Sequence, residues 1–156
     1  MRVQLALNVE DLDEAVDYYS KLFGAKVNKR KPGYANFAIE EPPLKLVLFE
    51  APEATERLNH LGVETFEQSD VDEAGARFRA GDISESEENE STCCFATQNK
   101  VWSIDPGGTR WEWYRILADA DEFGTPNTEP KASSADGSTA CCVATEGQAT
   151  QSVRGE

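Results

Sequence analysis

The larger apolar residues at the start of the chain occupy every second position, with Val3, Leu5 and Leu7 on one face of the segment 3–8. A period of two predicts a strand with one buried face. Over the segment 11–24, apolar residues recur every three or four positions behind an acidic first turn, which predicts an amphipathic helix. Three further strands are expected near Ala25–Lys29, Tyr34–Ile39 and Lys45–Glu50.

This order of elements then occurs a second time in the chain. The pair Gln4-Leu5 aligns with His60-Leu61, and after a three-residue insertion residues 11–15 align with residues 70–74. A second helix is therefore expected up to about Ala80, and a doubled chain of this kind predicts an α+β fold of two tandem βαβββ modules around a central cleft. The remaining strands are expected near Ser84–Glu88, Thr92–Thr97, Val101–Ile104 and Arg110–Arg115.

The composition changes near residue 118, beyond which Gly, Pro, Ser, Thr and Ala dominate and Phe123 is the last aromatic residue. Such a segment buries too little apolar surface to offset the entropy lost on ordering it. We therefore expect a folded domain followed by a flexible, disordered tail. The expected bounds are 1–117 for the domain, about 1–51 and about 58–117 for its two modules, and 118–156 for the tail.

The charge balance narrows the class of partner. Fifteen basic against twenty-nine acidic residues give a net charge of −14. Such a surface repels nucleic-acid phosphates and anionic lipid, so neither nucleic acid nor a membrane is expected as a partner. The sequence has no apolar run of membrane-spanning length and no secretory leader pattern, so a cytoplasmic location is expected. The sequence is compatible with a monomer and with a homodimer.

Three polar residues stand out as candidate metal ligands. Gln4 and His60, the single histidine of the chain, occupy equivalent positions in the first strands of the two modules. Glu112 lies between two tryptophans in the last strand and so faces the side opposite to them. If the tryptophans pack on the helices, Glu112 faces the cleft, where a divalent cation would compensate its charge. The position equivalent to Glu112 in module one is Val47, which cannot bind a metal and leaves coordination positions open.

The four cysteines form two adjacent pairs, Cys93-Cys94 and Cys141-Cys142. A bridge between neighbours closes almost no loop, so we expect reduced thiols, which suit soft metals and metalloids. Neighbours in a regular strand point to opposite faces, so the first pair can chelate one atom only at a strand end or in a loop, such as a mobile lid over 81–92. The alternatives are two small buried hydrophobic residues for this pair, and capping or solvent-facing roles for the candidate metal ligands.

With these residues in a doubled βαβββ chain, the sequence resembles the vicinal-oxygen-chelate (glyoxalase/bleomycin-resistance/extradiol dioxygenase) superfamily. Within it, the chain looks like the group of organoarsenical carbon–arsenic lyases and cadmium-inducible proteins. The stretches that carry the resemblance are Arg2–Val9, Pro32–Ile39, Pro42–Leu48, Asn59–Glu64, Thr92–Ala96 and Pro106–Glu112.

The resemblance implies roles for five residues. It implies that Gln4, His60 and Glu112 hold Fe(II) as the catalytic centre, and that Cys93 and Cys94 bind the substrate, a trivalent organoarsenical. Most extradiol dioxygenases carry a second histidine where this chain has Gln4, which argues against ring cleavage of catechols. Nothing in the family pattern assigns a function to Cys141-Cys142, which are candidate accessory thiols.

The activity that the resemblance implies is an Fe(II)-dependent, dioxygenase-type lyase. With O2 as co-substrate it would convert methylarsonous acid or an aromatic arsenical to arsenite, for arsenic and heavy-metal resistance. The main alternative is a thiol protein that sequesters cadmium or arsenite without turnover. A third possibility is thiol transfer or glyoxalase isomerisation, and Val47 argues against a glyoxalase site with four protein ligands.

Overall fold

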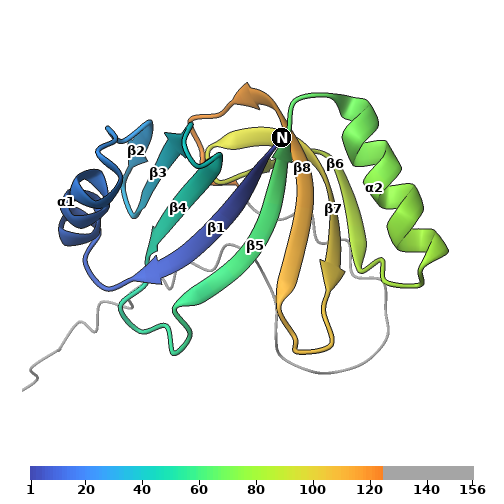
Figure 1. The fold of residues 1–156 in the computed structure, drawn as a ribbon, viewed down its shortest axis with the longest axis horizontal. Helices are drawn as coiled ribbons and strands as arrows, with labels where there is room; N and C mark the ends of the chain where they lie inside the picture. The colour runs from blue at the N-terminus through green and yellow to red at the C-terminus, as the bar shows by residue number, and fades with distance from the viewer. Residues whose placement is uncertain (125–156) are drawn as a thin grey trace, which may run out of the picture.

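The computed structural model describes residues 1–124, in which the order βαβββ occurs twice as expected (Figure 1). Most of the segment expected to form the tail, with Cys141-Cys142, lies outside these residues. The first module consists of β1 (Arg2–Val9), α1 (Leu12–Phe23), β2 (Lys29–Lys31), β3 (Tyr34–Ile39) and β4 (Leu44–Glu50). The second consists of β5 (Leu58–Thr65), α2 (Gln68–Ala80), β6 (Ser86–Cys93), β7 (Ala96–Ile104) and β8 (Arg110–Asp119).

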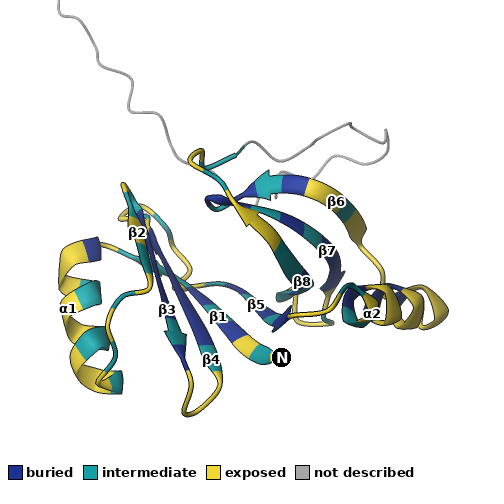
Figure 2. Cartoon of the chain, turned by 90° about the horizontal axis from the view of Figure 1, so that it is seen from above, coloured by how far each residue is buried: buried dark blue, intermediate teal, exposed yellow. Residues whose placement is uncertain are grey.

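All eight strands form a single curved sheet in the order β2-β3-β4-β1-β5-β8-β7-β6. The central pair, β1 and β5, is antiparallel, while β4 runs parallel to β1 and β8 runs parallel to β5. Leu5 of β1 lies opposite Leu61 of β5, its counterpart in the repeat, so the approximate two-fold axis passes through this pair. The strands of the two modules curve around a shared interior, and both helices lie outside it (Figure 2).

The helices cover the outer face of the sheet because apolar and polar side chains alternate along the strands, so that one face of the sheet is apolar. Every second residue of β3, from Ala35 to Ile39, packs under α1, as do Leu46 and Leu48 of β4. On the other side, Phe78 of α2 packs edge-to-face against Trp113, with ring centroids 5.7 Å apart. The intervening residues of each strand therefore face the interior, where polar side chains gather.

The bounds of one expected strand and the expected lid differ from the structure. The alternation over Ala25–Lys29 reflects packing of Ala25 and Val27 beneath α1, and β2 pairs with β3 only from Lys29 onward. The expected mobile lid over 81–92 is largely strand β6, which pairs with β7 at the sheet edge. The strand expected near Ser84–Glu88 corresponds to the first part of β6, which continues to Cys93 because backbone pairing needs no apolar side chains.

The last strand runs further than its apolar pattern indicated. Ala118 and Asp119 of β8 pair with Thr97 and Ala96, so the expected domain end at residue 117 falls inside the strand. The chain beyond it returns to the sheet, because the Phe123 carbonyl accepts a hydrogen bond from the Cys94 amide at 2.8 Å. None of the helices within residues 1–124 has the length and apolar character required to cross a membrane.

Candidate metal and thiol site

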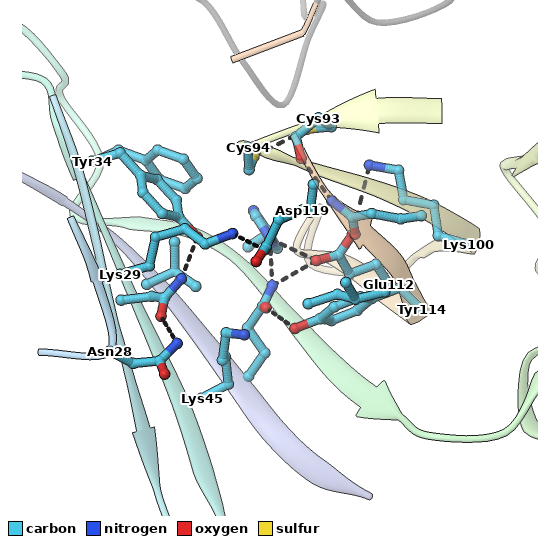
Figure 3. Close-up of a pocket in the computed structure, with 18 residues that line it drawn as sticks. Asn28, Lys29, Tyr34, Lys45, Cys93, Cys94, Lys100, Glu112, Tyr114 and Asp119 are labelled. Atoms are coloured by element: carbon cyan, nitrogen blue, oxygen red, sulfur yellow. Dashed lines mark hydrogen bonds and ion pairs between the residues drawn. The ribbon is translucent and has the colours of Figure 1, made fainter. Parts of the chain in front are cut away.

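The concave face of the sheet encloses a cavity of about 190 Å³ that receives residues from both modules (Figure 3). The cavity is polar at its floor and contains both classes of residue that the sequence singled out, the candidate metal ligands and the first cysteine pair. Its polar lining consists of Gln4, Asn28, Lys29, Tyr34, Asn36, Lys45, His60, Cys93, Cys94, Gln98, Lys100, Glu112, Tyr114 and Asp119.

Gln4, His60 and Glu112 meet at the floor of the cavity, and each is at most 4% exposed. Gln4 Nε2 donates a hydrogen bond to Glu112 Oε1 at 2.5 Å and lies 2.9 Å from His60 Nε2. His60 Nε2 lies 3.1 Å from Glu112 Oε1. The three side chains come from β1, β5 and β8, which are adjacent strands of the sheet, so the repeat brings them together.

The repeat also accounts for the asymmetry of the site. Gln4 and His60 are each the third residue of their strand. Val47 pairs with Ala6 on β1 as Glu112 pairs with Gly62 on β5, so Val47 occupies the position that matches Glu112. This correspondence was expected from the sequence, and the strand register confirms it.

The orientation of the His60 ring is set by a chain of two amides. Its Nδ1 lies 2.7 Å from Asn59 Oδ1, and Asn59 Nδ2 in turn donates to Asn8 Oδ1 at 2.9 Å. Because the Asn59 oxygen can only accept, His60 Nδ1 carries a proton. In the neutral imidazole the lone pair is then on Nε2, the atom that faces Gln4 and Glu112, as a metal ligand requires.

Tyr114 belongs to this site although the sequence interpretation did not include it. Its buried hydroxyl donates a hydrogen bond to Gln4 Oε1, which turns the Gln4 Nε2 group toward Glu112. Burial raises the pKa of Tyr114 well above its usual value, so the phenol stays protonated. Tyr114 follows Glu112 by two residues in the same strand, and this spacing is the signal that could have identified it.

Glu112 is buried but keeps its charge. Desolvation by burial opposes ionisation, but attraction by His60, its hydrogen bond to His60 and the nearby Lys100 ammonium together hold its pKa below the usual value. The Lys100 Nζ atom lies 3.9 Å from Glu112 Oε2 and 3.7 Å from Glu88 Oε2. The floor of the cavity therefore places a carboxylate beside the His60 imidazole and the Gln4 amide.

These three residues fit a divalent cation. Their facing atoms are 2.5 to 3.1 Å apart, and neighbouring ligands around an octahedral ion at ~2.1 Å lie about 3 Å apart. Rotation of the Gln4 amide by half a turn presents Oε1 in place of Nε2, since the two ends of an amide have nearly the same shape, and the Tyr114 hydroxyl oxygen can then accept a hydrogen bond from Nε2. Within residues 1–124, no group of three His, Cys, Asp or Glu residues is placed to hold a metal ion.

Cys93 and Cys94 form a second group in the same cavity, with Cys93 close enough to Glu112 for their charges to interact (Figure 3). The strand expected over Thr92–Thr97 is interrupted here, because Cys94 and Phe95 have positive φ of 56° and 61° and form a two-residue turn between β6 and β7. The turn brings the two sulfur atoms within 3.0 Å of each other, without a disulfide between them. From the sequence, we expected the two thiols to share a ligand only at a strand end or in a loop. Cys93 is the last residue of β6, so the pair lies at a strand end.

An aromatic cluster packs beside the cavity, and two of its rings, Tyr34 and Phe49, line the cavity itself. Tyr34, Phe49, Phe95 and Phe123, here called the aromatic wall, lie with neighbouring ring centroids 5.4 to 6.3 Å apart. Cys94 packs against this cluster, and the Phe49 ring lies 6.4 Å from the His60 ring. Burial raises the pKa of Tyr34 far above its usual value, so its hydroxyl is a neutral group in this wall.

A curved sheet from two βαβββ modules, with polar residues of adjacent central strands meeting inside it, defines the class of protein. The family model of the Glyoxalase/Bleomycin resistance protein/Dioxygenase superfamily matches residues 2–113, and the chain belongs to this superfamily. The resemblance expected from the sequence is thereby confirmed.

Two curated relatives indicate where this chain lies within the superfamily. The chain is 51% identical over 140 residues to the cadmium-induced protein CadI of Mycobacterium tuberculosis, covering 90% of this chain and 92% of the relative. It is 47% identical over 149 residues to the trivalent organoarsenical cleaving enzyme of Thermomonospora curvata, covering 90% and 99%. A solved Mn(II)-bound glyoxalase from Novosphingobium aromaticivorans shares the fold, with a TM-score of 0.57 at 19% identity over 75% of this chain and 39% of that one.

Proposed function

We propose that this protein is a carbon–arsenic lyase that uses Fe(II) and O2 to convert trivalent organoarsenicals to arsenite. The observation that carries the proposal is the presence of two distinct groups in one cavity: three donors suited to a divalent metal, and a vicinal thiol pair suited to a soft metalloid. The Thermomonospora curvata relative, named a trivalent organoarsenical cleaving enzyme, supports the same substrate class.

The metal in this proposal is held by Gln4, His60 and Glu112. One carboxylate with two neutral donors resembles the three-residue sites of non-haem iron oxygenases and leaves coordination positions open. A bound ferrous ion would supply the activation of O2. Asn59 and Tyr114 orient the His60 ring and the Gln4 amide, the part that outer groups play around a metal.

The thiols of Cys93 and Cys94 bind the arsenic atom. Each Cys sulfur replaces one hydroxyl of methylarsonous acid and its proton leaves with that hydroxyl as water, so that CH3As(OH)2 and two thiols give CH3As(SR)2 and two H2O. The 3.0 Å separation of the sulfur atoms allows one arsenic atom to accept both. The methyl or aryl group then remains as the third substituent of arsenic, within the cavity.

The aromatic wall favours an organic substituent over a bare ion. It extends from Cys94 to the neighbourhood of His60, so an apolar group on arsenic would contact Tyr34 and Phe49, the two rings that line the cavity, and be shielded from water. The overall conversion of CH3As(OH)2 and O2 to As(OH)3 and CH2O balances in atoms and electrons, so a complete cycle needs no further reductant.

A second candidate function is sequestration of cadmium or arsenite without turnover. It is favoured by the close thiol pair and by the cadmium-induced name of the Mycobacterium tuberculosis relative. The aromatic wall argues against it as the primary role, since a hydrated metal ion gains nothing from aromatic surface beside the thiols.

Reconstitution under anaerobic conditions separates the two candidates. The metal-free protein is loaded with Fe(II), methylarsonous acid is added, O2 is admitted, and arsenite and formaldehyde are quantified. The lyase proposal predicts both products in equal amounts. Stoichiometric arsenic binding with iron demonstrably present, but without arsenite release, would favour sequestration.

A further inference from the structure

Gly62 lies at the centre of β5, between two of the three proposed metal ligands. It pairs with Gln4 of β1 on one side and with Glu112 of β8 on the other. These two outer strands are two sheet spacings apart, which is ~9.6 Å. The Gln4 Nε2 and Glu112 Oε1 atoms are nevertheless only 2.5 Å apart. Both side chains therefore lean toward each other across β5, over Gly62.

The space above Gly62 is too small for a side chain. A Cβ atom built there would lie 2.8 Å from Glu112 Cγ, 3.1 Å from the Glu112 carbonyl oxygen and 3.5 Å from Gln4 Cβ. The glycine is not required by its backbone conformation, because Gly62 is not among the residues with positive φ. What position 62 requires is the absence of Cβ.

The two-fold axis of the fold supplies an internal comparison. Leu5 and Leu61 lie on that axis, so Ala6 is the counterpart of Gly62. Ala6 is fully buried and pairs with Val47 on β4, the counterpart of Glu112. Beside Val47 the chain therefore accommodates the Cβ of Ala6. Beside Glu112 it has Gly62, which carries none.

We propose that Gly62 is a positioning residue of the metal site: its missing Cβ lets Glu112 and Gln4 cross β5 and meet at His60. The inference rests on the proposed metal role of these residues. Restoring a Cβ at position 62 displaces the Glu112 side chain first, because Glu112 Cγ makes the closest contact. Metal affinity should fall even where the fold is retained.

The test is the affinity of the full-length, metal-free protein for Mn(II), measured by calorimetry for the wild type and for Gly62→Ala. We expect the dissociation constant to rise ~10- to 100-fold, the range found when groups that orient metal ligands are altered. The matched control is Gly75→Ala, whose Cβ is crowded by Arg79 and Val101 on α2 and β7 and should leave the affinity unchanged. Equal affinity in folded Gly62→Ala and the wild type would overturn the inference.

A double-mutant cycle on thermal unfolding tests the steric cause without any metal. Gly62→Ala should lower the melting temperature in the wild-type background and much less in the Glu112→Ala background, where Cγ is absent. The same comparison applies if Gly62→Ala alone does not fold, since Gly62→Ala with Glu112→Ala should then fold. An equal shift of the melting temperature in both backgrounds would overturn the inference. Failure to fold of both Gly62→Ala and the double variant Gly62→Ala with Glu112→Ala would also overturn it. A wild type that binds neither Mn(II) nor Fe(II) would instead refute the proposed function, while the cycle still decides the steric claim.

Discussion

The sulfur atoms of Cys93 and Cys94 lie 3.0 Å apart although neighbouring side chains of a strand point to opposite faces. The cause is the left-handed backbone of Cys94, with φ of 56°, in the turn after β6. The Cys94 amide is held by the Phe123 carbonyl, and Gln98 Nε2 donates to the Cys93 carbonyl at 2.9 Å. These contacts hold the backbone on both sides of the sulfur pair in place.

Loss of one thiol should remove most of the arsenical affinity. In a Cys141→Ser, Cys142→Ser background, Cys94→Ser leaves a single bond to arsenic in place of two, so the dissociation constant for methylarsonous acid should rise by orders of magnitude. Thiol titration checks the stoichiometry: the background protein should lose two reactive thiols per arsenical bound. An unchanged affinity in Cys94→Ser would show that the turn does not hold arsenic.

Tyr114→Phe should weaken metal binding without changing the ligands themselves. Without the phenol, the Gln4 amide loses its buried hydrogen-bond partner in either of its two orientations, which costs about 1–3 kcal/mol of unfolding free energy. The metal dissociation constant should rise about tenfold because the amide is no longer oriented. Tyr18→Phe, on the exposed face of α1, is the matched control for calorimetry with Mn(II). Equal metal affinity in both variants would remove Tyr114 from the site.

Phe49→Leu should weaken binding of the organic group of the substrate. This change keeps an apolar side chain but removes an aromatic face, which is worth up to ~1.5 kcal/mol, or about tenfold in affinity. Phenylarsonous acid should therefore bind less tightly, while arsenite, which has no organic group, should bind as before. Phe66→Leu, at a ring that is 56% exposed, is the control. A parallel loss for arsenite and phenylarsonous acid would mean that the wall does not contact the substituent.

Removal of residues 125–156 should leave turnover of methylarsonous acid largely intact. All the residues assigned to the metal and thiol groups lie between Gln4 and Tyr114, and β8 ends at Asp119. The measurement is arsenite formed per iron-loaded protein with and without these residues. A collapse of activity in the shortened protein would give Cys141-Cys142 more than an accessory role.

The parts of the site that follow from strand periodicity could be predicted from the sequence. The repeat identified Gln4 and His60 as counterparts on the two central strands, and alternation placed Glu112 away from Trp113, which packs on α2. The turn at Cys94 could not be predicted in this way, because nothing in the pattern over Thr92–Thr97 signals two residues with positive φ.

Other features of the site depend on neighbours that are distant in the chain. Gly62 reads as an ordinary strand interruption until the structure shows Gln4 and Glu112 crossing above it. The continuation of β6 beyond Glu88 to Cys93 was concealed by its polar residues, since pairing of its backbone with β7 needs no apolar side chains. Likewise, Lys29 of β2 bonds the Phe95 carbonyl across the two modules, at 3.1 Å, a contact that no local pattern encodes.

The central claim is that metal and arsenic are held by separate groups in one cavity. It is tested most directly by measuring iron and arsenic in the same protein sample, after anaerobic loading with Fe(II) and methylarsonous acid and removal of unbound ligand. In the Cys141→Ser, Cys142→Ser background, we predict that the protein retains both elements, that His60→Ala retains arsenic but loses iron, and that Cys93→Ser retains iron but loses arsenic. Loss of iron from folded Cys93→Ser, or loss of arsenic from folded His60→Ala, would contradict this division.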